Sequence, residues 1–99
     1  MVSHSDIKSY SINRSLKGLL DTIGFKDKKS FPLVLEFIRE KYKYLVKYDQ
    51  EDTGFVGVVI DTKDFSKIRF YNKEGYPFRS IEDTLNNTVL ALIEFKLIK

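Results

Sequence analysis

The chain contains no cysteine and no tryptophan, and only one histidine and two prolines among 99 residues. Without cysteine it can form no disulfide, no thiolate metal site and no cysteine nucleophile. No apolar run approaches the roughly 18 to 20 residues needed to cross a bilayer, and the segment 1–6 lacks the charged and then apolar pattern of a signal peptide. We therefore expect a cytoplasmic protein that does not associate with membranes.

The overall composition is that of an ordinary globular protein. Hydrophobic residues make up 42% of the chain and charged residues 31%, which differs from the low hydrophobicity of disordered chains. The aromatic share of 14% comes from eight Phe and six Tyr, whose rings bury much apolar area in a short chain. We expect one domain over residues 1–99, with residues 1–14 either poorly ordered or forming a short helix.

The positive charge is unevenly distributed. The net charge is +3, and residues 1–48 carry ten Lys or Arg against five Asp or Glu. A mildly basic chain of this kind suits an acidic partner such as a nucleic acid, but does not require one.

Two helices are predicted in the first half of the chain. Ser15 is a candidate N-cap and Gly24 a candidate C-cap for a first helix. The second helix is expected to start around Ser30–Pro32 and to end near Tyr42, because proline is tolerated in a first helical turn. Both segments have apolar residues at helical spacing, namely Leu16, Leu19, Leu20 and Ile23 in the first and Val34, Phe37, Ile38 and Tyr42 in the second.

The hydrophobic period then changes to two, which is typical of strands. We expect strands over Lys43–Tyr48, Phe55–Ile60 and Lys67–Tyr71, with turns at 49–54, 61–64 and 72–75 and a short edge strand at Tyr76–Phe78. The second strand is apolar on both faces and is therefore expected at the centre of the sheet.

The C-terminal helix has the clearest start. Ser80 is a candidate N-cap, and Glu82 and Asp83 follow in the first turn, where the helix dipole favours negative charge. The order of elements predicts an α+β fold. It is a two-layer sandwich in which an antiparallel meander of three or four strands is covered on one face by the N-terminal helices and the C-terminal helix.

No arrangement of residues points to catalysis. His4 is the only histidine, and the acidic residues at 49–52 and 61–64 lie in turns at opposite ends of the expected meander. The segment from Asp49 is not a calcium loop, because its twelfth position is Ile60 rather than glutamate. No glycine-rich phosphate loop is present. We therefore expect no enzymatic activity, no cofactor and no metal site.

A binding surface is the remaining hypothesis. Strand alternation groups cations with aromatic residues on one sheet face, where single-stranded nucleic acid could bind through phosphate contacts and base stacking. The predicted surface comprises Lys43, Lys47, Phe55, Val59, Lys67, Arg69 and Tyr71.

Phe55 and Val59 also support a second hypothesis, which we favour. If helices cover only one face of a strand that is apolar on both, the other face is left as an apolar patch. Such a patch predicts binding to another protein or self-association as a homodimer. The expected function is thus a non-enzymatic protein-interaction module, with single-stranded nucleic-acid binding as the alternative.

Residues 30–99 resemble small uncharacterised proteins encoded by phages and prophages of gut bacteria. The resemblance is carried by the helix Phe31–Tyr42, the aromatic-rich strands after it, and the segment Phe78–Leu85 that opens the last helix. It implies a helix, meander and helix fold and an accessory role in a mobile element, and it brings no catalytic residues.

Overall fold

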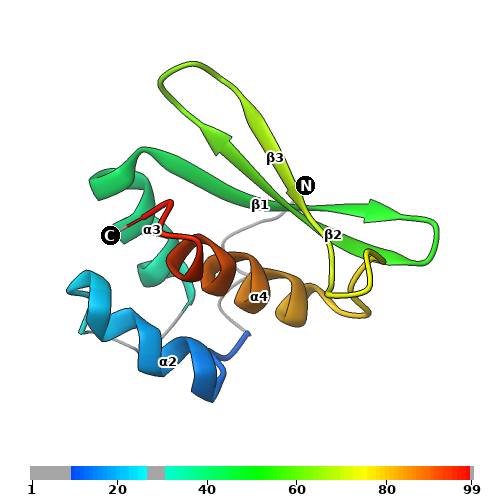
Figure 1. The fold of residues 1–99 in the computed structure, drawn as a ribbon, viewed down its shortest axis with the longest axis horizontal. Coiled ribbons are helices and arrows are strands. Elements are labelled where there is room, and N and C mark those ends of the chain that lie inside the picture. The colour runs from blue at the N-terminus through cyan, green and yellow to red at the C-terminus, as the bar shows by residue number, and fades with distance from the viewer. Residues whose placement is uncertain (1–9, 27–30, 99) are drawn as a thin grey trace.

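The computed structural model of the chain describes residues 10–26 and 31–98. In chain order the elements are α2 (Arg14–Leu20), the 3-10 helix η1 (Asp21–Ile23), α3 (Phe31–Tyr42), β1 (Tyr44–Glu51), β2 (Gly54–Asp61), β3 (Lys67–Phe70) and α4 (Ile81–Glu94) (Figure 1). The predicted α+β class, with an antiparallel meander and helices, is confirmed.

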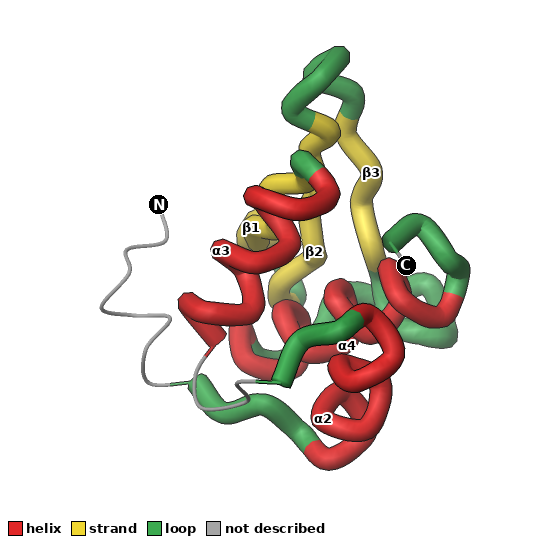
Figure 2. The backbone as a smooth tube through the Cα atoms, turned by 90° about the vertical axis from the view of Figure 1, so that its left-hand side faces the viewer, coloured by secondary structure: helices red, strands yellow, loops and turns green. Residues whose placement is uncertain are grey.

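The sheet is antiparallel with the strand order β1-β2-β3, so β2 is central as expected. The helices lie on one side of this sheet (Figures 1 and 2). Both α3 and α4 contact the sheet, whereas α2 packs against α4. The hairpin formed by β2 and β3 extends away from the helices and forms the top of the molecule in Figure 2.

Local sequence signals explain most helix boundaries. Ser80 caps α4 by accepting a hydrogen bond from the amide of Asp83, as predicted. Gly24 ends the first helical segment in the left-handed conformation (φ 83°), which glycine adopts at little cost. The expected cap at Ser15 is wrong, because Asn13 caps α2 by accepting from the amide of Leu16. The predicted start of α3 at Ser30 and the sole histidine, His4, lie outside the described residues.

The strands differ from the prediction at their ends. β1 runs to Glu51, so the expected turn at 49–54 is reduced to two residues. Lys43 lies before β1 with a positive φ of 65°, and therefore does not share the alternation of the strand. The expected edge strand at 76–78 is a single bridge in which Phe78 and Phe55 exchange backbone hydrogen bonds.

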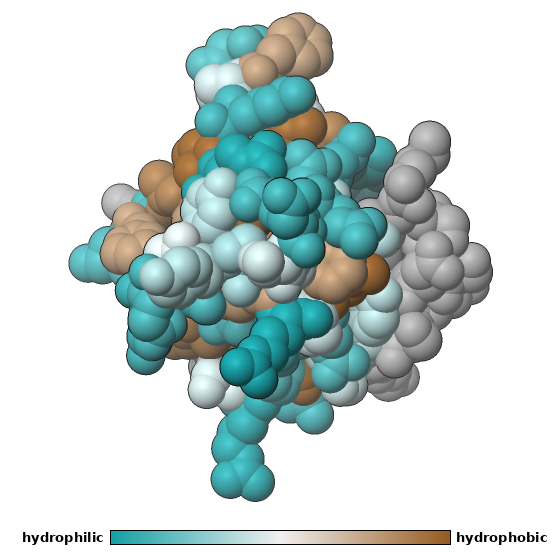
Figure 3. Space-filling view, turned by 90° about the vertical axis from the view of Figure 1, so that its right-hand side faces the viewer, coloured by the Kyte–Doolittle hydropathy of each residue, from teal (hydrophilic) through white to brown (hydrophobic). Residues whose placement is uncertain are grey.

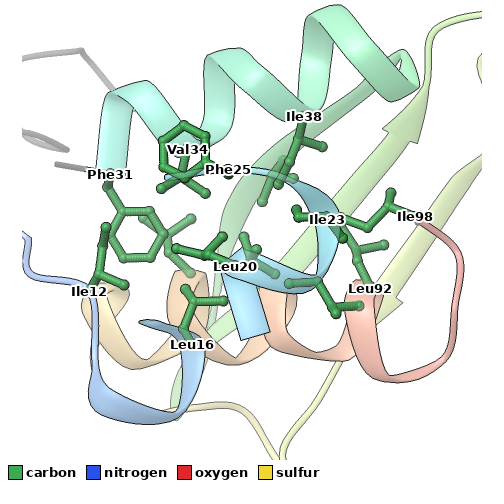
Figure 4. Packing of buried hydrophobic residues seen from close by; sticks show 14 of the residues in the cluster. Ile12, Leu16, Leu20, Ile23, Phe25, Phe31, Val34, Ile38, Leu92 and Ile98 are labelled. Atoms are coloured by element: carbon green, nitrogen blue, oxygen red, sulfur yellow. The ribbon is translucent and has the colours of Figure 1, made fainter. Parts of the chain in front are cut away.

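One hydrophobic cluster joins all the helices to the sheet. Leu16, Leu20, Phe31 and Ile38 are fully buried in it, and Val59 is its main contribution from the central strand. Figure 4 shows how side chains from α2, α3 and the C-terminal segment converge. Because α2 does not contact the sheet extensively, its Leu residues are buried mainly by the other helices.

A buried amide fastens the N-terminal segment to α4. The Asn86 side chain donates to the backbone carbonyls of Ser11 and Glu82, at 3.0 Å each, and its Oδ1 accepts from the amide of Asn13 at 2.8 Å. Asn86 is only 2% exposed, so these bonds satisfy a side chain that would otherwise be costly to bury.

Candidate functional site

The strand register decides which residues share a face of the sheet. Val46 pairs with Val59, and both belong to the core, so this face points toward the helices. The neighbouring pair Lys47 and Val58 points to the opposite, open face, where Arg69 of β3 stands beside Val58. The sequence-predicted surface therefore divides between the two faces.

Four of the seven predicted residues share the open face, namely Lys47, Lys67, Arg69 and Tyr71. Phe55 and Val59 are on the helix side, which corrects the prediction that they lie between the cations. Val59 is 1% exposed in the core, and the Phe55 ring packs edge-on against Tyr48 at 5.9 Å between ring centroids. The prediction for Phe55 and Val59 is wrong because β2 is apolar on both faces, so its sequence pattern does not indicate which residues face the helices.

The spare apolar patch expected on β2 is not exposed. Val56 and Val58 point to the open face, yet they are 0% and 6% exposed. Arg69 of β3 and Tyr71, which directly follows β3, reach residues of β1, so their side chains cross over β2 on this face. On the sheet face that no helix covers, polar side chains therefore form a layer over the valines of β2.

Arg69 is the centre of this layer. Its guanidinium donates to Asp49 at 3.2 Å and to Glu51 at 2.9 Å, and the Tyr71 hydroxyl donates to the same Glu51 oxygen at 2.9 Å. Hydrogen bonding with Tyr71, and then with Glu51 and Asp49, raises the pKa of Arg69 above its ordinary value. The arginine thus stays charged and is offset by two carboxylates, which lowers the positive potential of this face.

Residues 65–76 contain several exposed apolar side chains, which the sequence did not indicate. Seven large apolar side chains of the described residues are exposed, and four of them lie within residues 65–76: Phe65, Ile68, Tyr71 and Tyr76. Phe65 is 78% exposed at the tip of the β2–β3 hairpin, and Tyr76 is 68% exposed in the loop after β3. Figure 3 shows apolar surface beside hydrophilic side chains at the top of the molecule, where the β2–β3 hairpin ends.

The hairpin turn is held by its own carboxylates. Asp61 accepts from the amide of Lys63 at 2.8 Å, and Asp64 accepts from the amide of Ser66 at 2.9 Å. Hydrogen bonding from Ser66 lowers the pKa of Asp64, so this carboxylate is ionised at neutral pH. Phe65 donates its amide to the Asp61 carbonyl at 2.7 Å, which closes the turn.

The outer edge of β3 is unpaired among the described residues. Asp61 donates to the Ser66 carbonyl, and Phe55 and Phe78 exchange both of their bonds, so the odd-numbered residues of β2 bond toward the β3 side. Because bonded and non-bonded pairs alternate in an antiparallel ladder, the backbone groups of Lys67 and Arg69 point outward. This edge offers two N–H donors and two carbonyl acceptors.

Other kinds of site find little support. Within residues 10–26 and 31–98 no three His, Asp or Glu side chains gather as metal ligands, and no helix is both long and apolar enough to cross a membrane. A shallow groove of about 370 Å³ is lined by Thr22, Lys96 and three isoleucines, which provide few polar groups to orient a small molecule.

No family model, curated protein or solved structure matches the chain. The resemblance to phage-encoded proteins therefore stays a prediction.

Proposed function

We propose that the chain is a non-enzymatic protein-binding module that adds an extended segment of another protein to the free edge of β3. The observation that carries this proposal is the coincidence of an unpaired edge, at Lys67 and Arg69, with the exposed apolar stretch at 65–76. Strand addition uses backbone bonds for affinity and side-chain contacts for specificity, and this edge offers both.

The other edge strand is less suited to this role. None of the exposed large apolar side chains belongs to β1, and Val46 in its middle is buried by the core. β1 also contacts α3. An added strand would therefore gain little apolar contact there.

The proposal favours a protein over a nucleic acid. Asp49 and Glu51 lie on the open face among the cations and engage Arg69, so a phosphate chain following this face would approach two carboxylates. A peptide strand at the edge of β3 meets Lys67 without passing over this network.

The test begins with the chain itself as bait for a displayed library of random linear peptides. We expect enriched sequences with alternating apolar and polar residues, as an added strand requires. A synthetic peptide of the enriched sequence should bind the purified protein in fluorescence polarisation. Failure to enrich any sequence above an unrelated control protein contradicts the proposal.

A pair of variants at Lys67 locates the bound peptide. Lys67→Pro removes the outward N–H, and proline is tolerated at the first residue of an edge strand. Lys67→Gln keeps the N–H and removes only the charge. We expect Lys67→Pro to weaken peptide binding about tenfold and Lys67→Gln to weaken it less, whereas equal affinities for Lys67→Pro and the parent chain would place the peptide elsewhere.

A further inference from the structure

Resting on the proposed function, we infer that Phe65 is the anchor that selects the partner, and that the partner segment is acidic with an apolar side chain placed against the Phe65 ring. Phe65 lowers the stability of the turn in which it lies. Phe65 has a φ of +63°, a left-handed conformation that glycine or asparagine adopts far more readily than a bulky residue.

The ring brings no compensating burial. Phe65 is 78% exposed, which leaves most of its apolar surface in water. A phenylalanine at this position is therefore unfavourable to the isolated fold on two counts, namely backbone strain and exposure. Residues of this kind are typical of binding sites, where strain persists because the side chain serves a partner.

The backbone that carries the ring is also held in a defined conformation. The turn is closed by the Phe65 amide and by the carboxylates of Asp61 and Asp64, as described above. Thr62 donates both its amide and its hydroxyl to the Lys43 carbonyl, which fastens the hairpin to the start of β1. An ordered turn loses little backbone freedom when its aromatic side chain is buried by a partner.

The charges around the ring define the partner. Lys63 and Lys67 flank Phe65 in sequence, and both are exposed. Neither forms an ion pair with a described residue, although the charge of Lys63 contributes to the lowered pKa of Asp64. The two aspartates of the turn already accept backbone hydrogen bonds. The aspartate oxygens thus already bond within the turn, whereas the ammonium groups of the two lysines bond to no described residue, and carboxylates on the incoming segment would complement them.

The same charges argue against a second copy of this chain as the occupant. If β3 paired with itself in antiparallel fashion around Ile68, Lys67 would stand opposite Arg69 of the other copy. Like charges directly opposite one another destabilise a strand pair. An acidic segment from a different protein avoids this repulsion.

The experiment measures stability and binding in the same variants. Phe65→Gly and Phe65→Asn relieve the left-handed strain, and we expect the melting temperature of Phe65→Gly to rise by about 4 °C. Their affinity for the selected peptide should fall about tenfold or more, as at other interface anchors. Leu33→Ala is the matched control, because it truncates an exposed apolar residue on α3 and should leave the affinity unchanged.

A second arm tests the charge of the partner. Replacing the acidic residues of the selected peptide by their amides should weaken binding, and added salt should weaken the parent peptide more than the amide version. Unchanged affinity in both Phe65 variants, or a melting temperature lowered in both, overturns the inference. Equal binding of the amide peptide overturns the acidic partner. If instead the parent chain selects no peptide, the proposed function itself has failed.

Discussion

At the scale of single residues, Gly57 allows β2 and α4 to pack closely together. A Cβ atom built on Gly57 would lie 1.9 Å from Thr88 Oγ1 and 3.0 Å from Thr88 Cβ, so any larger residue must push α4 away from β2. Thr88 is itself fully buried, with its hydroxyl donating to the Thr84 carbonyl.

We therefore predict that Gly57→Ala lowers the free energy of unfolding by about 1 to 3 kcal/mol, as over-packed cores do. Thr88→Ala removes the nearest atom, Oγ1, together with Cγ2 at 3.1 Å, so the double variant should be more stable than the sum of the two single effects predicts. Urea denaturation of the four proteins measures this coupling. Strict additivity would mean that Gly57 and Thr88 do not meet as described.

At the scale of secondary-structure elements, the attachment of the N-terminal segment to α4 depends on Asn86. Removing this side chain leaves the Asn13 amide and the Ser11 carbonyl without their partner. We predict that Asn86→Ala costs about 1 to 3 kcal/mol of stability. The neighbouring Asn87→Ala is the control, because Asn87 is exposed and bonds only to the Asp83 carbonyl. Equal effects of the two substitutions in chemical denaturation would contradict this role.

The sequence predicted the elements better than their faces. The helical stripe of α3 and the Ser80 cap of α4 are strong local signals, and both are confirmed. The apolar composition of β2 indicated a central strand, but composition alone does not say whether Val59 or Val58 points to the helices. That choice depends on packing against α4 at Gly57, which is a tertiary contact.

The candidate site was only partly predictable for a similar reason. Arg69 and Tyr71 were expected on one face, and they are. Their carboxylate partners come from β1, where the turn was expected to begin at Asp49, so the neutralising charges were not anticipated. Nothing in the sequence pattern around Phe65 indicated an exposed side chain, because a phenylalanine is more often buried than exposed. In the structure the Phe65 backbone is left-handed and its ring is 78% exposed.

At the scale of the whole molecule, charge and burial together predict a monomer. The valines of β2 are buried on both faces, and self-pairing at β3 opposes like charges. Light scattering coupled to size exclusion should therefore give a mass near 11.6 kDa at micromolar concentration. A concentration-independent dimer would contradict the choice of a different protein as the occupant of the β3 edge.

The central claim is that a partner strand pairs with β3, and amide hydrogen exchange tests it most directly. In the free protein the Lys67 and Arg69 amides point outward and should exchange rapidly, while those of Ile68 and Phe70 are protected by β2. With the selected peptide bound, we predict slowed exchange at Lys67 and Arg69. Unchanged exchange at these two amides under saturating peptide would contradict the claim.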